Sequence, residues 1–236
     1  MTEPAISLAF FDPAREVHGT LRSGLAVLLE QGGGRTLDEQ PAIERDGSGF
    51  TVRCGDQVDL AFEPFSPPAD LGGSIARVCR VRGRAAGKEI DCLGTSGETT
   101  EAPAWAELDA LRLVSAVFDE EHAVLLAARR PSGAVGHGQE VIRAHVLSGE
   151  EMHEVEKARL STVYDADERQ RSVGLELWLP GEDFPRRGSG SARSGLSLSL
   201  GPLRVDVAIV AWRMEGRDGV GAYEITIREE PAAAAA

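Results

Sequence analysis

The amino-acid sequence predicts an all-β protein built as two antiparallel barrel or sandwich halves. Apolar and polar residues alternate along short segments, which is the side-chain period of a β-strand. Glycine, aspartate and proline separate these segments at intervals of about 8–12 residues, a spacing typical of sandwiches and barrels. A repetition of residues 107 positions apart indicates two related halves.

The first long alternation covers residues 17–29, where apolar side chains fall on one face and His18, Thr20 and Arg22 fall on the other. This pattern predicts one extended strand. Further strands with the same period are predicted at 50–53, 58–63, 75–82, 89–93, 111–118, 123–129, 140–147, 155–164, 173–179, 196–200, 205–214 and 223–228.

Three segments depart from simple alternation. Residues 205–214 are apolar on both faces, which predicts a central strand that is buried on both sides. Residues 103–110 are expected to form one short helix. The final residues, 231–236, are a proline and five alanines and are expected to form a disordered tail.

The repetition supports the hypothesis of an internal duplication. Its two copies are Ala9, Phe11, Asp12, Val17 and Arg22, and Ala116, Phe118, Asp119, Val124 and Arg129. The predicted organisation is an N-terminal β half over residues 1–96, a linker with the short helix over 97–110, and a C-terminal β half over 111–230.

Charge and composition exclude several classes of protein. The 236 residues carry a net charge of −13 at pH 7, which argues against nucleic acid and anionic membrane surfaces as partners. No stretch of about 20 apolar residues would insert into a membrane. Three cysteines without a CxxC pair indicate neither a disulfide framework nor a zinc site. No metal or other cofactor is predicted, and the start of the chain shows no signal peptide, so a cytoplasmic location is expected.

A family resemblance rests on three stretches: the duplicated opening, the junction 87–94 followed by Trp105, and the ending 215–224. With these stretches the sequence resembles the carotenoid hydratase and AttH-type lipocalin-like proteins. The resemblance implies two lipocalin-like halves enclosing an apolar ligand site. It also implies a hydrophobic ligand, isoprenoid or polyketide-like, and water addition or cyclisation as the reaction.

The junction makes Asp91 a candidate site residue. In the resembled family this junction carries an Asp-His-Ser-Trp-Gly type of run that contributes polar groups to the site. Asp91 and Gly94 match this run, whereas Cys92 and Leu93 stand where the family has His and Trp. If the chain is an enzyme, Asp91 would orient the proton donor or stabilise cationic charge.

Glu176 and His137 are the candidate proton donors. Glu176 and Trp178 lie opposite the aliphatic face of residues 173–179, where they would either line a second apolar space or pack under a loop. A desolvated Glu176 would be a candidate general acid. His137 stands among three glycines and close to Glu140, which suits either a site loop or a polar hairpin tip.

Aromatic residues are the candidate ligand contacts, together with Glu140. Trp178, Trp105, Trp212 and Tyr164 would line a cavity, although Trp212 on its doubly apolar strand is better suited to the core than to a ligand wall. His145 is expected to lie across from Glu154 as a cross-strand pair. His137 and His145 are too far apart on one strand, about 26 Å, to share a metal ion.

The sequence therefore leaves three functions open. The first is a binding protein, catalytically degenerate or never catalytic, for a hydrophobic small molecule. The second is an enzyme of the same shape that adds water to such a molecule or cyclises it. The third is an interaction module whose core is filled and which has no ligand. The sequence does not predict an oligomeric state, and common hydrolase, zincin and dinucleotide-binding motifs are missing from it.

Overall fold

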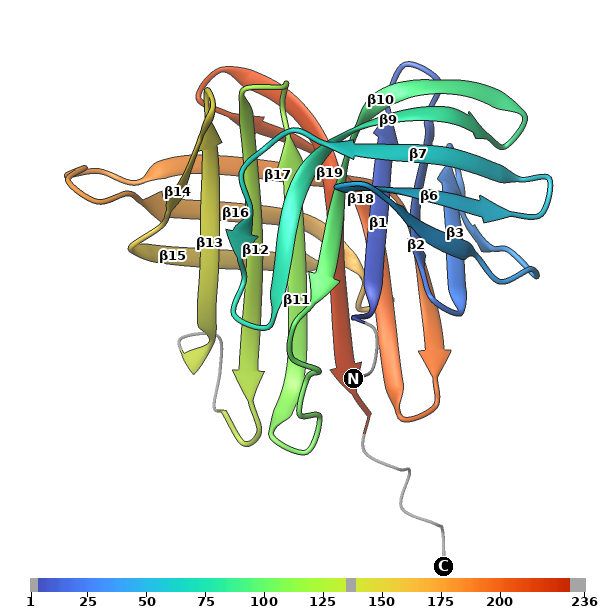
Figure 1. Cartoon of the computed structure of the whole chain (residues 1–236). Helices are drawn as coiled ribbons and strands as arrows, with labels where there is room; N and C mark the ends of the chain where they lie inside the picture. Colours follow the sequence, from blue (N-terminus) through green and yellow to red (C-terminus); the bar gives the residue numbers. More distant parts are fainter. Residues whose placement is uncertain (1–3, 135–138, 230–236) are drawn as a thin grey trace, which may run out of the picture.

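The computed structural model describes residues 4–134 and 139–229, and within them the chain forms strands and turns without an α-helix. Two large antiparallel sheets lie side by side (Figure 1). The strands of the first sheet are β1 (Ile6–Asp12), β2 (Val17–Arg22), β3 (Leu25–Glu30), β4 (Gly33–Thr36), β5 (Ala42–Asp46), β6 (Gly49–Cys54), β7 (Val58–Pro64), β8 (Ala69–Asp70), β9 (Ser74–Ala85) and β10 (Lys88–Thr99). Those of the second sheet are β11 (Leu108–Val117), β12 (His122–Pro131), β13 (Val141–Ser148), β14 (Glu151–Glu154), β15 (Lys157–Tyr164), β16 (Gln170–Trp178), β17 (Arg186–Leu200), β18 (Leu203–Met214) and β19 (Arg217–Arg228).

The two sheets share one strand order. The first runs β4-β3-β2-β1-β10-β9-β7-β6-β5, with β8 added beside β9, and the second runs β14-β13-β12-β11-β19-β18-β17-β16-β15. In each half a four-strand meander is therefore joined through its first strand to the last strand of the half. The prediction of an all-β fold with two curled halves is confirmed, and their common order is what the duplication hypothesis predicts.

Each sheet curls around its own apolar core. Phe10, Phe62 and Leu28 are fully buried in the core of the first half, and Trp212 and Tyr223 are fully buried in that of the second. Because side chains alternate along a strand, the outer face of each sheet carries a second set of residues.

A third apolar layer joins the halves, and we call it the seam. The first half contributes the outer faces of β1, β3 and β9 with the segment around β8, and the second half those of β11, β12, β13 and β18. Its buried members are Ala9, Phe11, Val27, Leu29, Ala69, Leu71, Ala76, Val78, Val117, Ala123, Leu125, Ala127, Leu147, Val205, Val207 and Ile209. In Figure 1, β1 lies close to β19 of the other sheet.

The structure corrects two elements predicted from the sequence. Residues 103–110 do not form a helix: Glu107 N–H donates to the carbonyl of Ala104 in a turn, and β11 begins at Leu108. The segment 17–29 is a hairpin and not one strand, because Gly24 adopts φ +82° and reverses the chain. Both faces of this hairpin are buried, one in the first core and one in the seam.

Candidate functional site

A cavity of about 120 Å³ lies in the seam between β1, β2 and β10 of the first half and β11, β12 and β19 of the second. Its apolar wall comes from both halves and includes Leu71, Leu113, Leu125 and Ala222. We call it the seam cavity. An apolar space with a few polar groups at a contact between two halves is the usual setting of a small-molecule site.

Thr20 supplies a buried hydroxyl group to this cavity. Thr20 points into the seam because it alternates with Leu21, whose side chain enters the first core. Only 7% of Thr20 is exposed, and among the described residues its Oγ1 has no hydrogen-bond partner. A buried hydroxyl group without a partner costs about 1–3 kcal/mol, so this atom is a ready hydrogen-bonding point for a ligand.

An ion pair crosses the seam at the edge of the cavity. Arg22 follows Thr20 on the same face of β2, and its guanidinium donates to the carboxylate of Glu224 on β19. The Glu224 side chain is 9% exposed and that of Arg22 is 29% exposed. The nearby carboxylate raises the pKa of Arg22.

Ser115 lines the cavity at an irregular part of the second sheet. The ladder between β11 and β19 is interrupted between Val114 and Val117. There the Ser115 hydroxyl accepts a hydrogen bond of 3.1 Å from Ala222 N–H. The side chain thus replaces a backbone acceptor where the hydrogen-bond ladder between β11 and β19 is interrupted.

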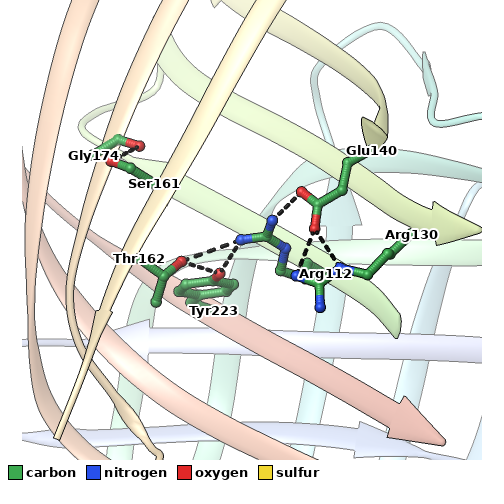
Figure 2. A network of polar contacts seen from close by, with 7 residues as sticks. All are labelled: Arg112, Arg130, Glu140, Ser161, Thr162, Gly174 and Tyr223. Carbon is green, nitrogen blue, oxygen red and sulfur yellow. Dashed lines mark hydrogen bonds and ion pairs between the residues drawn. The ribbon is translucent and has the colours of Figure 1, made fainter. Parts of the chain in front are cut away.

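A second polar cluster lies inside the second half and includes Glu140 (Figure 2). The side chains of Arg112 and Glu140 are each 1% exposed and form an ion pair, and Arg130 donates to the same carboxylate at 3.2 Å. Arg112 also donates to Tyr223 Oη at 3.2 Å and to Thr162 Oγ1 at 3.3 Å. Burial raises the pKa of Tyr223, an effect that neighbouring Arg112 opposes.

This cluster ties β11, β15 and β19 to the chain just before β13. It is separate from the seam cavity, because neither Arg112 nor Glu140 lines that cavity. Buried ion pairs add little net stability but fix geometry, so the cluster positions the segment that carries Glu140.

Asp91 and Glu176, the two predicted catalytic residues within the described part of the chain, do not lie together. Asp91 is exposed on β10 and pairs with Arg82 at 3.4 Å. Glu176 does not lie against an apolar wall: its carboxylate is 31% exposed and pairs with Arg187 and Arg159 on the outer face of the second sheet. His137 lies outside the described residues.

The predicted aromatic contacts are also dispersed, and none lines the seam cavity. Trp212 is 2% exposed in the second core. Trp178 lies on the outer face beneath Lys157 and Arg159, Tyr164 is 37% exposed, and the carbonyl of Trp105 accepts from Arg228. The predicted cross-strand pair of His145 and Glu154 is confirmed.

Sequence reasoning missed Thr20, Arg22 and Glu224 as site residues. The sequence showed only that His18, Thr20 and Arg22 share one face of the 17–29 segment. Alternation shows which residues share a face but does not show what covers that face.

The described residues contain no helix long and apolar enough to cross a membrane. Within the same ranges, no group of three or more His, Cys, Asp or Glu residues is placed to hold a metal ion.

The fold and the seam cavity define a lipocalin-like β protein of two halves with an apolar cavity between them. Solved structures share this fold. A protein from Nitrosomonas europaea, provisionally designated AttH, matches with a TM-score of 0.59 and 12% identity over 95% of this chain and 92% of that chain. CghA matches with a TM-score of 0.62 and 10% identity, over 98% of this chain and 90% of that chain.

CghA in complex with Sch210972 gives a TM-score of 0.57 at 10% identity with the same coverage. No protein-family model matches the chain. No curated protein matches it either. At these identities the likeness establishes the fold, and the lipocalin-like architecture implied by the resemblance is confirmed.

Proposed function

We propose that this protein binds a hydrophobic small molecule, such as an isoprenoid or a polyketide-like compound, in the seam cavity. The observation that carries the proposal is an apolar cavity built from both halves, into which the unpartnered hydroxyl of Thr20 points. A ligand with an apolar body and one hydroxyl or carbonyl group would satisfy both features.

The size of the cavity limits the ligand. A cavity of about 150 Å³ lined by aliphatic side chains holds a benzene molecule. At about 120 Å³ the seam cavity takes a comparably small group, and a longer molecule would extend through its open side. The structure of CghA with Sch210972 supports the proposal, because a protein of this fold is seen there with a small molecule.

Identification of a natural ligand is the first test. The protein is purified gently from its host, weighed by native mass spectrometry and extracted with organic solvent. We expect an apolar compound at near one-to-one stoichiometry. An empty protein that also fails to bind isoprenoid alcohols would favour the interaction module with filled cores.

A matched pair of probes tests the role of Thr20. Isothermal titration compares geraniol with myrcene, an isoprenoid hydrocarbon of similar size without the hydroxyl. We expect Thr20→Val to weaken geraniol binding about fivefold, the value of one neutral hydrogen bond, and Thr20→Ser to retain it. Equal loss in both variants, or binding of geraniol no tighter than myrcene, would contradict the proposed site. Tryptophan fluorescence is unsuitable, because no tryptophan lines the cavity.

Glu224 favours catalysis as the second candidate function. Its carboxylate lies in the wall of an apolar cavity, where it could transfer a proton during water addition or cyclisation of the bound molecule. Glu224→Gln would then bind the ligand but turn it over at least a hundredfold more slowly. A protein that binds the identified compound without converting it is a carrier and not an enzyme.

A further inference from the structure

A second cavity, of about 410 Å³, opens on the same seam. Its apolar wall is formed by Ile209 and Ala211 of β18 and Val220 of β19, and His18 of β2 lines it from the first half. Two acidic residues, Glu16 and Glu30, and the basic residue Arg193 also line it.

The two cavities follow one another along the same pair of strands. His18 and Thr20 are successive residues on one face of β2, and Val220 and Ala222 are successive residues on one face of β19. His18 and Val220 line the second cavity, whereas Thr20 and Ala222 line the seam cavity. Successive residues on one face of a strand are about 7 Å apart, so the two polar side chains stand one such step apart.

His18 offers a hydrogen-bonding atom like that of Thr20. Only 8% of His18 is exposed, and its Nδ1 has no partner within the described part of the chain. Burial lowers the pKa of His18 to about 4, partly offset by Asp12, so the imidazole is neutral near pH 7. A neutral ring carries one donor and one acceptor nitrogen, and either would bond a hydroxyl group.

We infer that the two cavities together bind one elongated, largely apolar molecule with two neutral hydrogen-bonding groups about 7 Å apart, one at Thr20 and one at His18. This inference rests on the proposed function of the seam cavity. A carboxylate on the ligand is disfavoured at the His18 end, because two acidic residues and one basic residue line that cavity.

Linear diols with a hydroxyl at each end test the spacing of the two anchors. Their affinities, from butanediol to decanediol, are measured by isothermal titration beside the monoalcohol of the same carbon number. We expect the ratio of diol to monoalcohol affinity to peak at one chain length, with a gain of about fivefold from the second hydrogen bond. In His18→Leu this ratio should fall to about one.

A measurement on the unchanged protein guards against a variant that fails to fold. Nitrogen NMR of labelled histidine should show a change in the chemical shifts of the His18 ring nitrogens when the optimal diol binds, and no such change when its monoalcohol binds. If monoalcohols and geraniol bind but no chain length is preferred and the ring does not shift, the inference is wrong and the proposed function stands. If neither diols nor alcohols bind, both are wrong.

Discussion

Thr20 and His18 face the seam with polar atoms that have no partner among the described residues. Each such atom costs about 1–3 kcal/mol when buried, a cost that folding alone gives no reason to bear. Both lie on the face of β2 that packs against the other half, and both border a cavity. At the scale of single residues, these two atoms are therefore the strongest indication of a ligand.

Burial of His18 should make stability depend on pH. Its pKa is lowered from 6.5 to about 4, so between these values the unfolded state binds a proton that the folded state does not. The free energy of unfolding should therefore fall as pH drops from 6.5 to about 4, by about 3 kcal/mol from this residue. Urea denaturation across this range measures the effect.

His18→Gln is the control, because it cannot titrate there. Burial also lowers the pKa of His145, which adds a loss of the same sign to both proteins, so the difference between them isolates His18. Equal pH dependence in the two proteins would show that His18 is protonated without cost in the folded state.

The ion pair across the seam should contribute more than the surface pairs. Arg22→Met leaves the poorly exposed Glu224 carboxylate without its partner, and we expect a loss of about 2 kcal/mol in the free energy of unfolding. Arg82→Met, which breaks the exposed pair with Asp91, should cost at most about 1 kcal/mol. Equal losses would mean that solvent screens both pairs alike.

At the scale of elements, the contact between β11 and β19 depends on a glycine. A Cβ at Gly221 would lie 1.9 Å from the carbonyl oxygen of Ser115, which is backbone and cannot rotate away. We expect Gly221→Ala to separate the strands and to lower the free energy of unfolding by about 3 kcal/mol or more. Thermal and urea denaturation measure the loss.

Gly201→Ala is the matched control for this substitution. Gly201 adopts φ +61°, and a Cβ at this position would have no atom within 4 Å, so an alanine meets backbone strain but no clash. The expected loss is about 1 kcal/mol. If Gly221→Ala were no worse than this control, the strands would separate there at little cost.

The predicted elements were correct where side-chain alternation determines the structure and wrong where a turn interrupts the chain. The doubly apolar pattern of residues 205–214 predicts burial on both sides, and β18 contributes to both the second core and the seam. In the segment 17–29 the alternation of apolar and polar residues continues through the Ser23-Gly24 turn, so the sequence pattern does not reveal the hairpin. The prediction of a helix at 103–110 is wrong because Leu108 and Ala110 belong to β11 and pair with neighbouring strands.

At the scale of the whole molecule, the seam makes the halves interdependent. It buries apolar side chains of both sheets, and charged contacts such as that of Arg80 with Glu120, at 2.9 Å, reinforce it. We expect the intact chain to unfold in one cooperative transition, detected identically by circular dichroism and tryptophan fluorescence.

Separating the halves at the linker tests this dependence. Fragments divided after Ala102 should each aggregate when expressed alone, because the apolar face of the seam would be exposed. Co-expressed fragments should copurify as a one-to-one complex. Two fragments that are each monomeric and fold cooperatively would show that the seam is not needed for folding.

The sequence by itself predicted the all-β class from side-chain period and turn residues, the two halves from the repetition of residues 107 positions apart, and the pairing of His145 with Glu154 from the turn between them. Only the tertiary structure decided the site. Glu176 and Glu224 both lie on strands of the second half with alternating faces, yet the face of Glu176 meets solvent and that of Glu224 meets the first half. Alternation assigns a residue to a face, and the packing of distant segments determines whether that face is covered.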